Sequence, residues 1–155
     1  MNGFARLIEK YSEAHHRELT RKCSPILEKL GISHFNYETI SNTGHLNSLT
    51  TRPDWMLYFG ENLLRQYSPL HVHPENLSPG FYWSKLMSSD FNSKIIKYAS
   101  NFGIAQMFFL VERDTVGCSK YTFGFHSQRI ELGFLVQSEI DILRKFTIFF
   151  NYFLR

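Results

Sequence analysis

The order in which helical and extended segments follow one another limits this chain to a small group of folds. Segments with apolar residues at helical spacing, the first at residues 4–11, alternate in pairs with extended segments rich in β-branched and aromatic residues. A turn sequence divides each extended pair, at Asn42-Thr43-Gly44 and at residues 114–117. The resulting pattern, ααββααββα, predicts two antiparallel hairpins separated by helices.

This order is typical of a small sheet with a layer of helices on each face. We therefore expect an α+β protein, an α/β/α sandwich with about five antiparallel strands, of the PAS or GAF kind. Proline, glycine and capping residues mark the helix boundaries. Helices are predicted to start at Ser24-Pro25, Pro53-Asp54, Ser68-Pro69 and Ser138, the last through a capping box with Asp141, and to end at Gly31 and Gly103.

Length and composition predict one domain over residues 1–155. The chain is 43% hydrophobic and contains 15 phenylalanines, which is ample for a core, and its net charge of +3 is too small to indicate nucleic-acid binding. Cys23 and Cys118 make neither a disulfide framework nor a zinc site, and they suit a reducing compartment. The sequence has neither the apolar run of a signal peptide nor one long enough to cross a bilayer. We expect a cytoplasmic domain without membrane contact.

Four short sequence features follow one another along the chain at a characteristic spacing. They are Trp55 after an extended segment and a proline, the step Ser68-Pro69, Trp83, and the stretch YASNFGI at residues 98–104. In this combination the chain resembles the N-terminal autoinducer-binding domain of LuxR-type quorum-sensing transcriptional regulators. The resemblance covers nearly the whole chain, and the joint spacing is more specific than any single motif. It implies a signal-sensing regulatory domain and not an enzyme.

The resemblance also implies a ligand and its polar contacts. In the family the ligand is an acyl-homoserine lactone; Trp55 would donate its indole N–H to the lactone carbonyl and Trp83 would pack against the ring. Phe59 stands where the family has a tyrosine that binds the amide carbonyl, and Ser68 stands where it has an aspartate that binds the amide N–H. Each lost contact leaves a buried polar group unpaired, at a cost of about 1–3 kcal/mol. Two losses weaken binding by roughly two orders of magnitude or more, so tight binding of standard lactones is not expected.

The remaining pocket positions are mostly apolar. By the same resemblance, His71 replaces an apolar residue that lines the acyl chain, and Met107 replaces a glycine that lets a strand pass close to its neighbours. The others keep the apolar character of an acyl tunnel. The predicted ligand-binding residues are Trp55, Phe59, Ser68, Leu70, His71, Trp83, Ile95, Ile96, Ala99 and Ile104.

Structural interpretations of the same residues stay open. Trp55 and Trp83 also fit a role as core aromatics, and Ser68 fits a helix cap before Pro69. His71 has only His73 nearby as a second possible ligand, so no metal or other cofactor is predicted. Cys118 and His126 lack a residue to orient the histidine, so no catalytic residue is predicted.

Two functions therefore remain. The first is a signal-sensing domain with an altered pocket, for an acyl-homoserine lactone-like molecule or another acyl amide. The second is a ligand-free dimerisation module that modulates a full-length regulator, its pocket filled by Met107 and aromatic side chains. The last helix, with FTIFFNYFLR from Phe146, is apolar on more than one face, which favours a homodimer. DNA binding would belong to the C-terminal helix-turn-helix domain of the family, which these 155 residues lack; a cut at the domain boundary and a natural stand-alone sensor both fit.

Overall fold

A computed structural model describes residues 13–43, 46–70, 77–115 and 117–154. In this part of the chain five strands form one antiparallel sheet in the order β2-β1-β5-β4-β3. The strands are β1 (Ile32–Ser41), β2 (Leu46–Thr50), β3 (Gly80–Trp83), β4 (Gln106–Arg113) and β5 (Gly117–Phe125). The predicted α+β fold with a small antiparallel sheet is confirmed.

Both predicted hairpins are present, and they meet in the middle of the sheet. β1 pairs with β2, and β4 pairs with β5 across a turn in which Asp114 Oδ1 accepts a hydrogen bond of 2.9 Å from the Gly117 N–H. The hairpins join through β1 and β5, which run antiparallel from Ile32 opposite Phe125 to Ser41 opposite Gly117. The short edge strand β3 was not predicted; it adds to β4.

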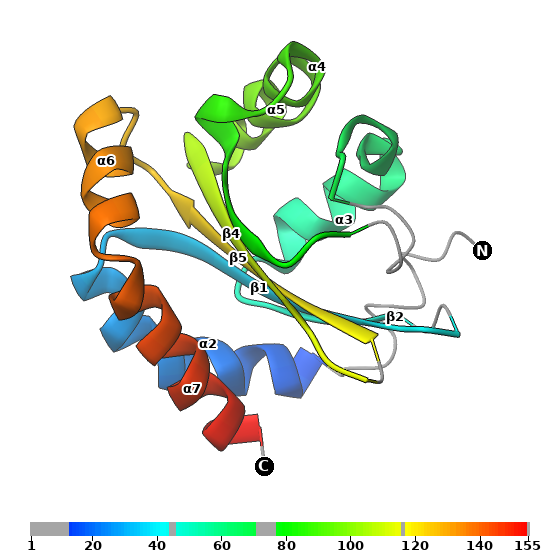
Figure 1. Ribbon diagram of the computed structural model, residues 1–155, viewed down its shortest axis with the longest axis vertical. Helices are drawn as coiled ribbons and strands as arrows, with labels where there is room; N and C mark the ends of the chain where they lie inside the picture. Colours follow the sequence, from blue (N-terminus) through cyan, green and yellow to red (C-terminus); the bar gives the residue numbers. More distant parts are fainter. Residues whose placement is uncertain (1–12, 44–45, 71–76, 116, 155) are drawn as a thin grey trace.

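Helices cover both faces of the sheet (Figure 1). Helices α3 (Pro53–Glu61), α4 (Ser89–Phe91) and α5 (Lys97–Ala99) lie over what we call the α3 face. Helices α2 (Glu13–Lys29), α6 (Ile130–Ser138) and α7 (Ile140–Leu154) lie over the other, the α7 face. Because successive strand residues point to opposite sides, every strand contributes to both interfaces.

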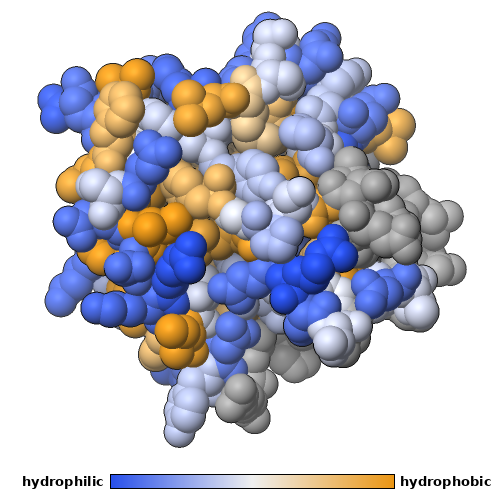
Figure 2. Space-filling view, in the orientation of Figure 1, coloured by the Kyte–Doolittle hydropathy of each residue, from blue (hydrophilic) through white to orange (hydrophobic). Residues whose placement is uncertain are grey.

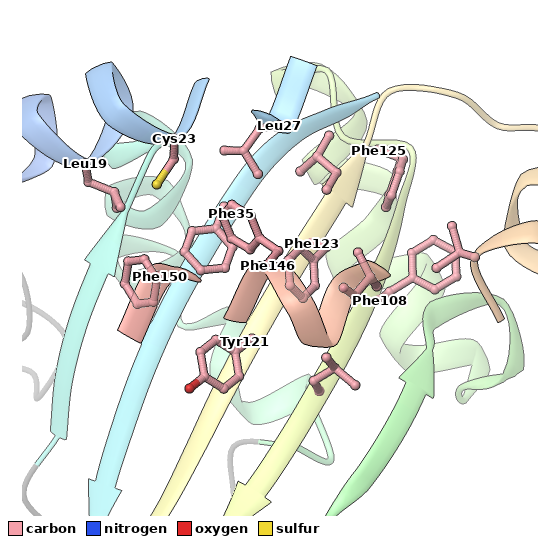
Figure 3. Close-up of a cluster of buried hydrophobic side chains, with 14 of the residues drawn as sticks. Leu19, Cys23, Leu27, Phe35, Phe108, Tyr121, Phe123, Phe125, Phe146 and Phe150 are labelled. Carbon is pink, nitrogen blue, oxygen red and sulfur yellow. The ribbon is translucent and has the colours of Figure 1, made fainter. Parts of the chain in front are cut away.

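The core of the α7 face is unusually aromatic (Figure 3). Its centre is Phe35 on β1, whose ring centroid lies 5.3 Å from that of Phe123, 4.9 Å from that of Phe146 and 4.9 Å from that of Phe150. All four rings are buried, and burying one such side chain contributes about 1.5–3 kcal/mol. This cluster attaches α7 to the sheet.

Helix α2 runs through Pro25 without a break, so the helix start predicted at Ser24-Pro25 is wrong. Leu19, Cys23 and Leu27 stand four residues apart and form one buried stripe that spans the proline. Burial of this stripe outweighs the local cost of a proline in a helix, which is about 3 kcal/mol. The predicted end is confirmed, since Gly31 follows with a left-handed φ of 74°. The helix predicted before α2 lies outside the described residues.

The capping box predicted at Ser138 is also wrong. Ser138 ends α6, a helix that was not predicted, and its hydroxyl donates a 2.9 Å hydrogen bond to the Leu135 carbonyl. The last helix nevertheless starts close to the predicted place, at Ile140. Gly133 fixes the position of α6, because a Cβ at this residue would overlap the ring of Trp83.

The helix that is predicted to end at Gly103 is confirmed as a helical stretch from Ser89 to Phe102, but it is irregular. Helix α4 continues into a π-helical turn at Asn92–Ile96, then into α5 and a 3-10 turn at Ser100–Phe102. Gly103 ends the stretch with a φ of 76°. π-helical turns are rare and often mark functional sites.

None of the described helices combines the length and the hydrophobicity needed to cross a membrane. Within the same residues, no three His, Cys, Asp or Glu side chains are grouped so that they could hold a metal ion.

Candidate ligand-binding site

A buried cavity lies between the sheet and the helices of the α3 face. Its volume is about 30 Å³, enough for water-sized molecules. Most of its apolar lining comes from α3, from the helical stretch after β3 and from strand β4. Strands β1 and β5 supply polar side chains. The lining residues are His34, Asn36, Glu38, Trp55, Met56, Phe59, Ser68, Phe91, Ile95, Met107, Phe109, Lys120 and Thr122.

The wall of the cavity opposite the sheet is built from α3 and the irregular helix that follows β3. Pro53 starts α3, and the helical spacing brings Trp55 and Phe59 to the same side, with ring centroids 5.8 Å apart. Ile95 comes from the π-helical turn and is 1% exposed. The wall therefore offers hydrophobic contact and few polar groups.

The floor of the cavity is a buried network of polar side chains. The Asn36 amide donates a hydrogen bond of 2.7 Å to Glu38 Oε1, and it accepts one of 3.0 Å from the Ser48 hydroxyl on β2. Glu38 Oε2 lies 3.4 Å from Lys120 Nζ on β5, and both side chains are almost completely buried. A buried ion pair needs such additional hydrogen bonds to offset the loss of hydration. Its charges cancel, so the floor as a whole is close to neutral.

Burial controls the electrostatics of this floor. It lowers the pKa of Lys120, and the nearby Arg65 lowers it further, whereas the Glu38 carboxylate acts in the opposite direction. Burial also lowers the pKa of His34 to about 3, with the positive charge of Arg52 as a second cause. His34 is therefore neutral at physiological pH, with one donor and one acceptor nitrogen.

Four of the ten predicted site residues line the cavity: Trp55, Phe59, Ser68 and Ile95. Leu70, Ala99 and Ile104 are buried in the same hydrophobic cluster but do not line it. Ile96 is half-buried against that cluster, and His71 lies outside the described residues. The Ser68 hydroxyl accepts a 3.3 Å hydrogen bond from the Leu70 N–H, so it stabilises a turn after the 3-10 helix Leu64–Tyr67.

Trp83 lies on the other side of the sheet. It stacks on Phe108, at 5.8 Å between ring centroids, and its indole N–H donates a 3.0 Å hydrogen bond to Gln106 Oε1. Both contacts belong to the core of the α7 face, so the structure does not bring Trp83 to the cavity. Because successive side chains of a strand alternate between the two faces, the preceding residue, Tyr82, points to the α3 face. There it packs against the hydrophobic cluster around the cavity.

Comparison with known proteins gives matches at the level of structure. No family model matches the chain, and no curated protein matches it. SdiA in complex with octanoyl-rac-glycerol aligns over 93% of this chain and 64% of that chain, with a TM-score of 0.57 and 14% identity. The N-acylhomoserine lactone dependent LuxR family factor CepR2 from Burkholderia cenocepacia aligns over 92% and 87%, with a TM-score of 0.62 and 10% identity. The chain has the fold of a LuxR-type autoinducer-binding domain.

A third structure has the same LuxR-type fold. The ligand-binding domain of VqsR from Pseudomonas aeruginosa aligns over 96% of this chain and 92% of that chain, with a TM-score of 0.51 and 15% identity. Identities this low support the common fold alone. The chain spans 64% of the length of the SdiA structure, so what the whole SdiA protein does is not transferred with the fold.

The polar floor of this LuxR-type fold was missed in the sequence. His34, Asn36 and Glu38 alternate with Phe35 and Tyr37, and polar residues in such an alternation usually face solvent. A signal was available, because helices were predicted on both faces. A polar row under a helical layer has to be buried, and a buried polar row is a candidate site.

Proposed function

We propose that this chain is a signal-sensing domain of LuxR type whose pocket has altered polar contacts. The observation that carries the proposal is the buried cavity on the α3 face, where Trp55, Phe59, Ser68 and Ile95 meet a polar floor. Phe59 cannot donate a hydrogen bond, and the Ser68 hydroxyl, which accepts one from the Leu70 N–H, is a shorter acceptor than the aspartate it replaces and carries no charge. Standard acyl-homoserine lactones are therefore expected to bind weakly, in a cytoplasmic protein without catalytic activity.

A ligand has to enlarge the cavity. The present volume of about 30 Å³ is far below the roughly 300–1,000 Å³ of pockets for drug-sized ligands. Two of the lining residues, Met56 and Met107, have flexible side chains that repack easily. Ligand entry in this proposal displaces these side chains and the π-helical turn outward from the sheet.

The ligand class is a small amphipathic molecule with an acyl chain. The structure of SdiA, one of the proteins with the same fold, was determined in complex with octanoyl-rac-glycerol. That molecule has an uncharged head with hydroxyl groups and an ester in place of the amide, so it has no amide N–H that needs the aspartate that Ser68 replaces. We therefore choose it as the first probe for this chain.

Thermal unfolding with added ligand tests the proposal. We expect octanoyl-rac-glycerol to raise the Tm of the wild type, and N-octanoyl-homoserine lactone to raise it less. The double variant Phe59→Tyr/Ser68→Asp restores both missing polar groups and should bind the lactone roughly a hundredfold more tightly. Absence of any shift with either probe on the wild type would refute the sensing function. An unchanged lactone shift for the double variant would refute the assignment of Phe59 and Ser68.

A ligand-free interaction module is the second candidate, and the small volume of the cavity favours it. In that function Met107 and Phe109 fill the former pocket permanently, and the protein acts through dimerisation. We propose α7 as the dimer contact in either case, because several of its apolar side chains are exposed. Contact with DNA would be made by a separate domain outside residues 1–155.

A further inference from the structure

The imidazole of His34 is the one group of the cavity floor whose buried nitrogen lacks a hydrogen bond among the described residues. His34 is 1% exposed, and its Nδ1 atom is buried without a partner there. A buried polar nitrogen in this state costs about 1–3 kcal/mol unless a ligand or a water molecule pairs with it. Asn36, Glu38 and Lys120 are already joined to Ser48 by two hydrogen bonds and one ion pair.

A glycine on the neighbouring strand leaves space for the His34 side chain. Gly124 stands opposite His34 in the β1–β5 register, and a Cβ at Gly124 would lie 3.0 Å from the His34 Cβ and 3.3 Å from its Cδ2. Contacts of 3.0–3.4 Å are tighter than nine in ten real Cβ contacts, so a side chain at position 124 would push the imidazole by a few tenths of an ångström, and the glycine leaves room for it. The ring lines the cavity together with the indole of Trp55.

We propose that His34 is the specificity-determining contact for the head group of the ligand, and that this head group is uncharged and forms hydrogen bonds. This inference rests on the proposed sensing function. Its observations are the unpaired Nδ1 atom, the glycine opposite, and a floor on which the charges of Glu38 and Lys120 cancel. The polar end of the ligand lies against the sheet, and its acyl chain lies against the apolar helical wall.

The paired charges of the cavity floor indicate that the head group of the ligand is uncharged. A carboxylate or an ammonium group brought into the cavity would lose its hydration shell, and the charged lining residues Glu38 and Lys120 already pair with each other. A hydroxyl, ester or amide group needs only one donor or acceptor, which the neutral imidazole supplies. Among ligands with the same acyl chain, the uncharged one should therefore bind best.

The test compares three probes on the wild type and on variants at position 34. Isothermal titration with octanoyl-rac-glycerol, octanoate and octyltrimethylammonium should give binding of the first and at least tenfold weaker binding of the other two. His34→Leu keeps a side chain of similar size without polar atoms, and it should weaken octanoyl-rac-glycerol binding about tenfold. His34→Asn places an amide near the position of Nδ1 and should retain most of the affinity. His126→Leu, at an exposed histidine, is the matched control and should bind like the wild type.

The outcomes separate this inference from the proposed function. If the wild type binds octanoyl-rac-glycerol and His34→Leu binds it equally well, His34 pairs only with water and the inference is overturned. If octanoate or octyltrimethylammonium binds as tightly as octanoyl-rac-glycerol or more tightly, the inference that the head group is uncharged is overturned. If the wild type binds none of the three probes, the inference fails, and if N-octanoyl-homoserine lactone does not bind either, the sensing function fails with it. His34→Leu removes an unpaired buried group, so its Tm without ligand should equal or exceed that of the wild type, which excludes misfolding as the cause of lost binding.

Discussion

At the scale of single residues, the chemistry of the cavity depends on polar side chains that are buried but close to neutral in sum. Glu38 and Lys120 compensate each other at 3.4 Å, and Asn36 holds the carboxylate in place. His34 stays uncharged because burial makes its protonated form unfavourable. The same property makes the stability of the fold depend on pH.

His34 should make the protein sensitive to acid. Its pKa is about 3 in the folded protein and 6.5 in the unfolded chain, so below pH 6.5 the unfolded chain binds a proton that the folded protein does not. The free energy of unfolding should therefore fall as the pH falls from 6.5 toward 3, by about 2–3 kcal/mol at pH 4.5. Urea unfolding at pH 7 and pH 4.5 measures this loss. Between these two pH values the free energy of unfolding of His34→Leu should fall by about 2–3 kcal/mol less than that of the wild type. Equal losses in both proteins would contradict the buried, neutral state of His34.

At the scale of elements, α6 and α7 present more apolar surface than the sheet covers. Ile148 is 70% exposed and Tyr152 is 79% exposed on α7, and Phe134 is 59% exposed on α6. Figure 2 shows hydrophobic surface over these two helices. Exposed apolar patches on a folded domain commonly mark a site of association.

The proposed dimer should therefore depend on Ile148. Ile148→Glu places a charge in the contact and should shift the monomer–dimer equilibrium by at least tenfold toward the monomer, because a charged group is costly to bury unpaired. Sedimentation velocity over a range of concentrations measures this shift. Ser93→Glu introduces the same charge at an exposed position of the α3 face and serves as the control. A wild type that stays monomeric at high concentration, or an Ile148→Glu variant that dimerises as the wild type does, would exclude this contact.

The elements that the sequence predicts well are those with a clear period and clear boundaries. Both hairpins and the helix that starts at Pro53 fall into this group. Helix α6 was missed because its apolar residues follow no single face and it contains Gly133, and β3 was missed because it has four residues. The place of Trp83, away from the cavity, has a simple cause. Neighbouring residues of a strand point to opposite faces of the sheet, and the spacing of motifs in the sequence does not say which of the two faces carries the cavity.

At the scale of the whole molecule, the three-layer arrangement could be predicted because the order of segments allows few alternatives. The cavity was predictable only in part. Trp55, Phe59, Ser68 and Ile95 line it, and their contact with a ligand stays a prediction. The polar floor depends on long-range pairing of β1 with β5, which places His34 and Glu38 beside Lys120. In the proposed function, the altered polar contacts at Phe59 and Ser68, rather than the fold, decide which ligand binds.

The most direct test of the sensing function is a binding isotherm for octanoyl-rac-glycerol on the wild type and on Ile95→Phe. Ile95 is 1% exposed and lines the cavity, so a larger side chain there occupies the space that the acyl chain needs, at a cost of about 1–3 kcal/mol in stability. We expect saturable binding to the wild type and at least tenfold weaker binding to a variant that still unfolds cooperatively. No binding to the wild type, or the same affinity for both proteins, would contradict a ligand site between the sheet and the α3 helices.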